Sequence, residues 1–164
     1  MADITNALAE SRAAVDRLLA AADCTGSAWA TPRAPGKWSP SQVVEHVARA
    51  YEESALSAAG KPTRFPTFPG FVRPIIRKLF FDRTVRGGAF PRGKTNRAMN
   101  PDIGSPTPAD ARVRLQRAHA AFEQACLECN GTFNHSIFGR VSAADYATFQ
   151  ALHTLHHTRQ IAQS

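Results

Sequence analysis

Hydrophobic residues recur along most of this chain at steps of three and four positions, the spacing of one face of an α-helix. The pattern covers residues 3–22, 39–59, 107–130 and the stretch from 142 towards the end. Polar residues occupy the other sides, so each stretch predicts a helix of about five turns with one face suited to a shared core. No segment shows a convincing alternation of apolar and polar residues, and no β-strand is expected.

Local signals mark where the predicted helices begin. Ser39 can cap the second helix, Pro40 fits its first turn, and Gln42 stands where a capping box needs it. Trp38 directly precedes the cap, at the position of a hydrophobic staple. Similar start signals stand at residues 107–110 and 142–145.

The connection between the second and third helices, residues 61–105, is long and contains six prolines. A short helix is predicted within it at about 72–84, with Ile75, Ile76, Leu79 and Phe80 as its apolar face. Connections of this length inside a compact domain are usually functional or mobile. With 164 residues and 43% hydrophobic content, the chain is predicted to form one domain, residues 1–164. The predicted fold is all-α, an antiparallel four-helix bundle with a long basic insert between helices two and three.

The net charge of +7 is concentrated in the insert. Residues 61–97 hold ten lysines and arginines against one acid, Asp82, a local balance of +9, whereas the rest of the chain has a balance of −2. Such a field attracts phosphate, nucleic acid, acidic lipid or a carboxylate substrate, and the alternative is a solvated surface. Four arginines of the insert are candidates for holding an anionic ligand: Arg73, Arg77, Arg83 and Arg86. No nucleic-acid recognition motif accompanies them, so a nucleic-acid partner is not expected.

The cysteines and the N-terminus favour a cytoplasmic protein. Three cysteines, Cys24, Cys126 and Cys129, give an odd count without the framework of a secreted disulfide scaffold. Cys126 and Cys129 fall late in a helical pattern and are interpreted as core or helix-flank thiols, with redox or zinc roles as the alternative. No signal peptide is recognised at the N-terminus, and no apolar stretch approaches the ~20 residues of a membrane span. The sequence therefore predicts a cytoplasmic protein without a membrane partner.

Three of the six histidines stand within five positions of the last predicted helix. His153 and His157 are four residues apart, which on a helix places their Cβ atoms roughly 5–6 Å apart on one face. Two imidazoles at this spacing can reach one metal ion, and His156 competes with His157 as the partner of His153. The spacing also arises by chance, as a polar flank of a helix, so a third ligand must come from elsewhere.

His46 is the third candidate ligand, because it points along the apolar stripe of the second helix between Val43 and Ala50. Metal sites in helical bundles form in the core from side chains on facing helices. Three neutral imidazoles would leave coordination positions open, as in catalytic sites. The alternative is a hydrogen-bonded core histidine. His119 is expected to be solvent-exposed, and His135 is expected to be a loop residue, with a role beside the metal or as a proton shuttle as the alternative.

Three segments of the chain resemble the DinB/YfiT-like family of four-helix metal-binding proteins. They are Lys37-Trp38-Ser39-Pro40-Ser41-Gln42-Val43-Val44-Glu45-His46-Val47, His135-Ser136-Ile137-Phe138-Gly139 and His153-Thr154-Leu155-His156-His157-Thr158-Arg159-Gln160-Ile161. In that family the first and last histidines of the closing His-x-x-His-His-x-x-Gln-Ile pattern bind the metal. The resemblance therefore implies His46, His153 and His157 as ligands, rather than His156. Residues 61–105 match no family motif.

The resemblance also implies a range of functions. Known members include metal-dependent transferases and isomerases that use a low-molecular-weight thiol. We therefore expect a divalent metal ion, Zn or Ni, with a low-molecular-weight thiol as a second expected cofactor. The expected function is a metal-dependent thiol transferase or hydrolase-like enzyme for a small, anionic substrate. The alternatives are a non-enzymatic metal- or ligand-binding protein and, less favoured, a nucleic-acid-binding protein. A homodimer is also expected from the resemblance.

Overall fold

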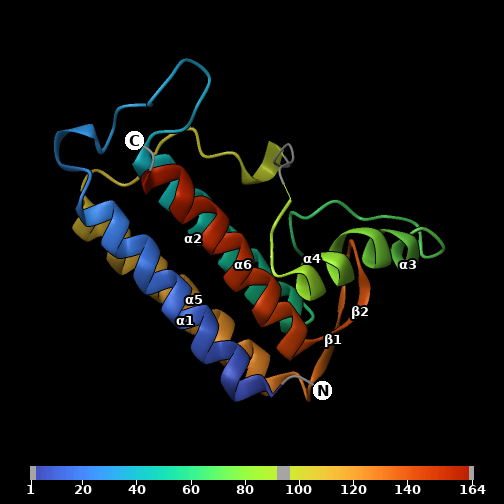
Figure 1. Cartoon of the computed structure of the whole chain (residues 1–164). Coiled ribbons are helices and arrows are strands. Elements are labelled where there is room, and N and C mark those ends of the chain that lie inside the picture. The colour runs from blue at the N-terminus through green and yellow to red at the C-terminus, as the bar shows by residue number, and fades with distance from the viewer. Residues whose placement is uncertain (1–2, 92–96, 163–164) are drawn as a thin grey trace.

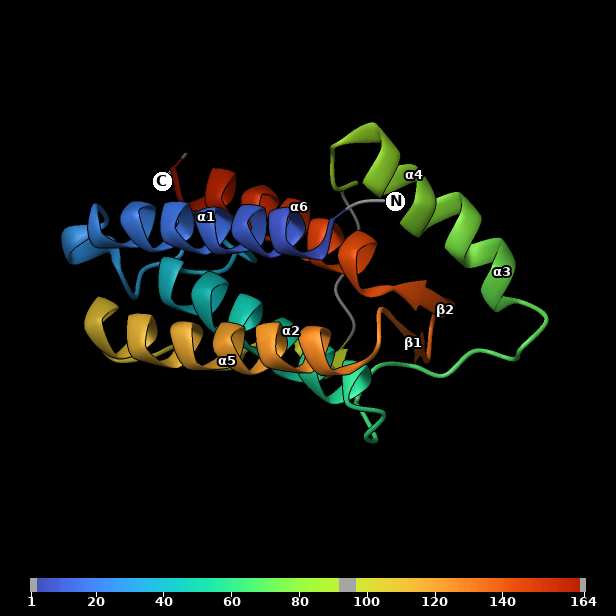
Figure 2. The ribbon, with the colours of Figure 1, turned by 90° about the horizontal axis from the view of Figure 1, so that it is seen from below.

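The computed structural model describes residues 3–91 and 97–162, and the chain is mostly helical, as predicted. Four long helices lie side by side (Figures 1 and 2). They are α1 (Ile4–Asp23), α2 (Pro40–Ala58), α5 (Pro108–Glu128) and α6 (Ala143–Ala162). The shorter elements are η1 (Gly26–Ala28), α3 (Arg73–Ile76), η2 (Arg77–Phe81), α4 (Asp82–Gly87), η3 (Arg97–Met99), β1 (Thr132–His135) and β2 (Gly139–Ser142). No helix in these described ranges has both the length and the apolar character needed to cross a membrane.

The long helices run as two parallel pairs of opposite direction, α1 with α6 and α2 with α5, and these pairs have the most extensive contacts (Figure 2). Side-chain contacts show the directions. Asp23, the last residue of α1, pairs with Arg112, early in α5, whereas Glu45, early in α2, pairs with Arg114, also early in α5, at 2.6 Å. The prediction of antiparallel neighbours is therefore wrong for both of these pairs, α1 with α6 and α2 with α5. A short loop would have reversed the chain, whereas the long connection between Ala58 and Pro108 lets α5 begin at the same end of the bundle as α2.

The core lies between the predicted apolar faces of the long helices. Leu18, Val47, Tyr51, Leu115 and Phe122 are all fully buried. Ser39 caps α2 as predicted, because its side chain accepts a hydrogen bond from the Gln42 amide while the Gln42 side chain bonds back to the Ser39 amide. The helical periodicity of the sequence thus places its core residues correctly.

His119 was predicted to be exposed, and this is wrong. It is buried on α5 at 5% exposure, and its Nε2 atom lies 3.0 Å from the hydroxyl oxygen of Ser11 on α1. That hydroxyl also lies 3.0 Å from the Tyr51 hydroxyl of α2, so three helices meet in one buried polar cluster. Burial lowers the pKa of His119. The residue joins helices rather than facing solvent.

A β-hairpin precedes α6, and the expectation of no strand is wrong here. β1 and β2 pair antiparallel, with Phe133 opposite Val141 and His135 opposite Gly139. Gly139 has a φ of 71°, a left-handed conformation that glycine adopts without strain. Phe133 and His135 point inward and are buried, so the hairpin packs against the helices and leads directly into α6. His135 is therefore a strand residue rather than a loop residue.

The helical part of the insert spans α3, η2 and α4, residues 73–87, close to the predicted 72–84. Its predicted apolar face is only half right. Ile75 and Leu79 are 58% and 66% exposed, whereas Phe80 packs against the core and Phe81 is buried. Contacts of α4 with α6 orient the segment so that the phenylalanines face inward. Two basic residues of the insert, Arg92 and Lys94, lie outside the described residues.

Candidate metal centre

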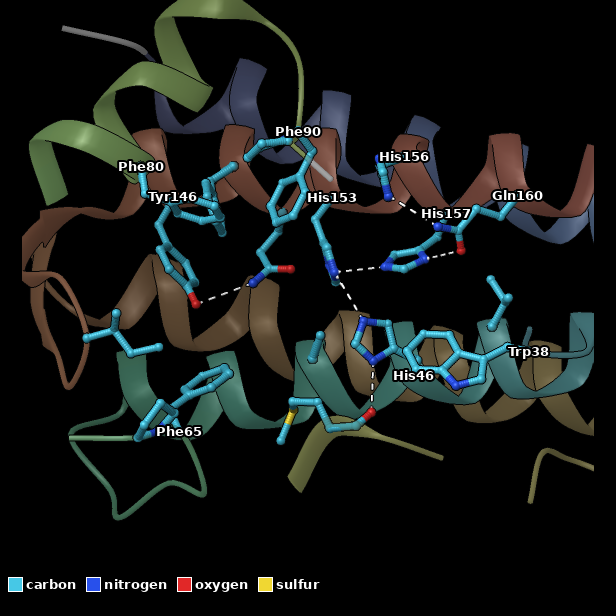
Figure 3. A pocket seen from close by; sticks show the side chains of 18 of the residues that line it. Trp38, His46, Phe65, Phe80, Phe90, Tyr146, His153, His156, His157 and Gln160 are labelled. Atoms are coloured by element: carbon cyan, nitrogen blue, oxygen red, sulfur yellow. Dashed lines mark hydrogen bonds between the residues drawn. The ribbon is translucent and has the colours of Figure 1, made fainter. Parts of the chain in front are cut away.

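Two facing helices bring the three predicted histidines together (Figure 3). His46 comes from α2, and His153 and His157 come from successive turns of α6. The Nε2 atom of His153 lies 3.2 Å from Nε2 of His46 and 3.1 Å from Nε2 of His157. All three possible ligand atoms lie within 4.8 Å of one another. The antiparallel course of α2 and α6 makes this meeting possible.

Two of the three rings are fixed by hydrogen bonds from their other nitrogen. His46 Nδ1–H donates to the carbonyl oxygen of Met99, and His157 Nδ1–H donates to Oε1 of Gln160, each over 2.9 Å. An oxygen of this kind only accepts, so Nδ1 carries the proton in both rings and Nε2 keeps its lone pair. Metal-binding histidines typically show this second hydrogen bond. Both rings are therefore held in the ligating tautomer.

The nitrogen separations suit a small divalent cation. Imidazole nitrogens lie about 2.0–2.1 Å from zinc, so two of them in a tetrahedral site are about 3.3 Å apart. The pairs of His153 with His46 and with His157, at 3.2 and 3.1 Å, are near this value. His153 Nε2 can carry at most one proton and can donate it to only one of the other two lone pairs. A cation would accept the lone pairs of all three Nε2 atoms at once, so the three histidines fit a metal ion.

Burial keeps the cluster unprotonated. Loss of solvent lowers the pKa of His46 to about 4 and that of His157 to about 3, and it lowers the pKa of His153 well below the ordinary value. Neighbouring histidines lower all three further. His153 lies deep in the molecule but keeps part of its side chain accessible. The neutral form, which binds metal, is thus the resident form at neutral pH.

Aromatic rings enclose the histidines. The Trp38 ring packs on His46 with centroids 4.8 Å apart and stacks on His157 at 6.1 Å, and Phe90 packs on His153 at 4.8 Å. Trp38 was predicted as a helix staple, and the structure also makes it a wall of the site. His156 belongs to the same neighbourhood, but its Nε2 faces the amide nitrogen of Gln160 at 3.2 Å.

The profile of the DinB superfamily matches residues 7–161. The chain belongs to the DinB superfamily. The matched range includes α2 and all three histidines, as well as the whole insert. Searches of curated proteins and of solved structures found no significant match. In this DinB-superfamily chain, any more specific function must therefore be argued from the site itself.

The three histidines His46, His153 and His157, called the triad below, line a cavity of about 450 Å³. Trp38 and the triad mark one end, and Phe65 and Tyr146 lie towards the other (Figure 3). Much of the wall is aromatic, formed by Trp38, Phe65, Phe80, Phe90, Phe138, Tyr146 and Phe149. Arg33 and Lys37 also line the cavity, and no aspartate or glutamate does so within the described residues. The cavity is therefore apolar with a cationic contribution at its wall.

His135 lies at the cavity wall as well, in a single tautomer. Its Nδ1 accepts a hydrogen bond from the Ile137 amide at 3.1 Å, so its Nε2 carries the proton and donates to the Tyr146 hydroxyl at 3.0 Å. Burial lowers the pKa of His135 to about 3. Both ring nitrogens are occupied by these two hydrogen bonds. It orders the hairpin and α6, and its predicted roles beside the metal or as a proton shuttle stay untested.

The arginines proposed from sequence to hold an anion do not line the histidine cavity. Arg73, Arg77, Arg83 and Arg86 line a second hollow beside the hairpin, together with Arg140. The Nε atom of Arg73 donates to the Phe68 carbonyl oxygen at 2.7 Å, and the Nε atom of Arg77 lies 3.4 Å from Asp82. The insert contributes mainly phenylalanine and proline residues to the lining of the histidine cavity. Anion binding by these arginines stays a prediction, and it concerns the hollow beside the hairpin rather than the histidine cavity.

The cysteines take no part in the histidine cluster described here. Cys126 is buried, Cys129 is half-buried, and Cys24 is exposed. The Cys129 thiol donates to the Cys126 carbonyl oxygen at 3.3 Å, and burial raises the pKa of both thiols. This agrees with core and helix-flank thiols. Sequence reasoning missed the supporting roles of Met99 and Gln160; the spacing of Gln160, three after His157, was the one usable signal.

Proposed function

We propose that this DinB-superfamily protein binds a divalent metal ion, Zn²⁺ or Ni²⁺, through the Nε2 atoms of His46, His153 and His157. The observation that carries the proposal is the convergence of the three Nε2 atoms within 4.8 Å, with the Nδ1–H groups of His46 and His157 already bonded to oxygen. Three buried, neutral imidazoles with their Nε2 atoms turned towards one another are an unfavourable arrangement without a cation, and this is the arrangement that a metal ion requires.

We further propose that the bound metal serves an enzyme of the thiol transferase or hydrolase-like kind. Three protein ligands leave coordination positions open, and a bound ion would act as a Lewis acid and lower the pKa of a coordinated water or thiol. The protein holds the three nitrogens and surrounds them with Trp38 and Phe90, which limits access of bulk water. A low-molecular-weight thiol is the proposed second cofactor.

The cavity supports a small substrate with an apolar part and an anionic group. Its aromatic walls suit an apolar body, and Arg33 and Lys37 supply positive charge without an acid among the described lining residues. The proposed anion attraction therefore comes from residues between α1 and α2, rather than from the arginines of the insert.

The proposal is tested by metal analysis of the purified wild-type protein beside His46→Ala, His153→Ala and His156→Ala. We expect close to one metal ion per wild-type chain, a loss of most of it in the first two variants, and retention in His156→Ala, whose ring faces Gln160. Equal metal content in all four proteins would remove the site. His156→Ala is the matched control, because it deletes a histidine from the same helix.

The enzymatic part has its own test. A panel of thiols with electrophilic acceptors, together with esters, should show turnover by the metal-loaded protein that His153→Ala lacks. Stoichiometric metal without turnover of any member, and without an open coordination position, would favour a non-enzymatic metal- or ligand-binding protein instead. A homodimer and the absence of a nucleic-acid partner stay predictions.

A further inference from the structure

Gln150, on α6, presents a buried oxygen that has no hydrogen-bond partner among the described residues. The residue is 3% exposed and lies on the cavity wall. Its amide nitrogen donates to the hydroxyl oxygen of Ser54 at 2.8 Å and to that of Tyr146 at 3.3 Å. Its Oε1 atom is buried and receives nothing. An unsatisfied buried acceptor is destabilising, so we expect this oxygen to have a donor in the functional state.

The orientation of the amide follows from its neighbours. The Ser54 hydroxyl donates to the Ala50 carbonyl oxygen at 2.6 Å, so its oxygen is free to accept from the Gln150 nitrogen. The nitrogen is thus directed towards Ser54 and towards Tyr146, one turn earlier on α6. The carbonyl oxygen of the same planar group is then directed away from Tyr146. The next turn of α6 carries His153.

His153 has a potential hydrogen-bond donor that lacks an acceptor, which complements the unpaired oxygen of Gln150. When its Nε2 binds a metal ion, its Nδ1 must carry a proton and becomes a donor. The corresponding Nδ1–H groups of His46 and His157 have oxygen acceptors, but within the described residues Nδ1 of His153 has none. Gln150 precedes His153 by three residues, a spacing that places the Cβ atoms roughly 5–6 Å apart on a helix. An orphan acceptor and an orphan donor therefore lie on adjoining turns.

We propose that Oε1 of Gln150 accepts a hydrogen bond from Nδ1–H of His153 in the metal-bound protein, and that Gln150 is a positioning residue of the site. The inference rests on the proposed function, because it needs a metal at Nε2. Each of the three ligands then has an oxygen acceptor behind it: Met99, Gln150 and Gln160. Such a bond fixes the tautomer and the ring plane and raises the basicity of the ligand. Ser54 and Tyr146 hold the amide in the required orientation.

The test is zinc affinity, measured by competition with a chromophoric chelator, for the wild type and for Gln150→Leu, Gln150→Glu and the control Gln116→Leu. Loss of the acceptor in Gln150→Leu should weaken zinc binding about 10–100-fold. Gln150→Glu, which restores an acceptor, should bind at least tenfold more tightly than Gln150→Leu. Gln116→Leu makes the same change at an exposed position of α5, away from the cavity, and should stay within about threefold of the wild type. Equal affinity of Gln150→Leu and the wild type would overturn the inference.

A second measurement needs no variant. Imidazole ¹⁵N–¹H correlation spectra of the zinc-loaded wild type should show the His153 proton on Nδ1, slow to exchange. A proton on Nε2, with Nδ1 as the ligand, would overturn the inference even if zinc binds. A wild-type protein that binds no zinc would instead refute the proposed function, so the two failures are distinguishable.

Discussion

At the scale of single residues, burial decides what each histidine does. His119 follows Leu115 by four positions and precedes Phe122 by three, so the helical spacing had placed it on the buried face of α5. The polar residue type, not the pattern, led to the wrong prediction of exposure. His46, His153 and His157 were correctly brought together because their spacing and the family resemblance agreed. The acceptor behind the His46 ring could not be predicted, since Met99 is 53 residues from His46 along the chain.

His135 gives the first prediction, on pH. Its pKa is about 3 in the folded protein, because burial removes solvent, and about 6.5 in an unfolded chain. The unfolded state therefore binds protons more tightly than the folded state. The contribution of the neutral His135 ring to the free energy of unfolding is complete above about pH 6.5 and is lost as the pH falls towards 3. Between pH 7.5 and 5 the metal-free wild type should lose about 2 kcal/mol more of its free energy of unfolding than His135→Gln.

Urea unfolding of both proteins at the two pH values measures this difference. The other buried histidines titrate in both proteins alike, so their contributions cancel in the comparison. An identical pH dependence of the wild type and His135→Gln would show that the buried ring is not the neutral group described here.

At the scale of elements, the helices follow from sequence and the hairpin does not. The predicted start at Ser39 is confirmed together with both bonds of its capping box. The strands are four residues each, and their inward residues are only Phe133 and His135 in β1 and Val141 in β2. Three inward residues are too few for an alternation of apolar and polar positions to distinguish a strand from a loop. The pairing register depends on Gly139 and on packing against α6, which are tertiary features.

The cap of α2 gives the second prediction. Ser39→Ala removes the side-chain acceptor for the Gln42 amide and should lower the free energy of unfolding by about 1 kcal/mol. Because Ser39 is 2% exposed, solvent cannot replace the lost partner. Urea unfolding measures the loss, with the exposed Ser27→Ala as the control expected to change stability by less than about 0.5 kcal/mol. Equal stability of the two variants would mean that the cap contributes nothing.

At the scale of the whole molecule, the course of the chain builds the site. Since α2 and α6 are antiparallel, the early turns of α2 meet the late turns of α6, where His46 faces His153 and His157. The connection from 59 to 107 crosses between the ends of the helices and supplies Phe65, Phe90 and Met99 to the cavity. A connection of this length leaves the direction of α5 open, so the sequence could not predict the parallel pair. The insert contributes walls to the site, and its arginines lie elsewhere.

The central claim is a metal ion held by three imidazoles and by no cysteine of the chain. The most direct measurement is the X-ray absorption spectrum at the zinc edge of the zinc-loaded protein, prepared without added thiol. We predict a shell of nitrogen and oxygen at about 2.0–2.1 Å with the outer scattering of three imidazole rings. A sulfur shell at about 2.3 Å, or fewer than three imidazoles in the wild type, would contradict it.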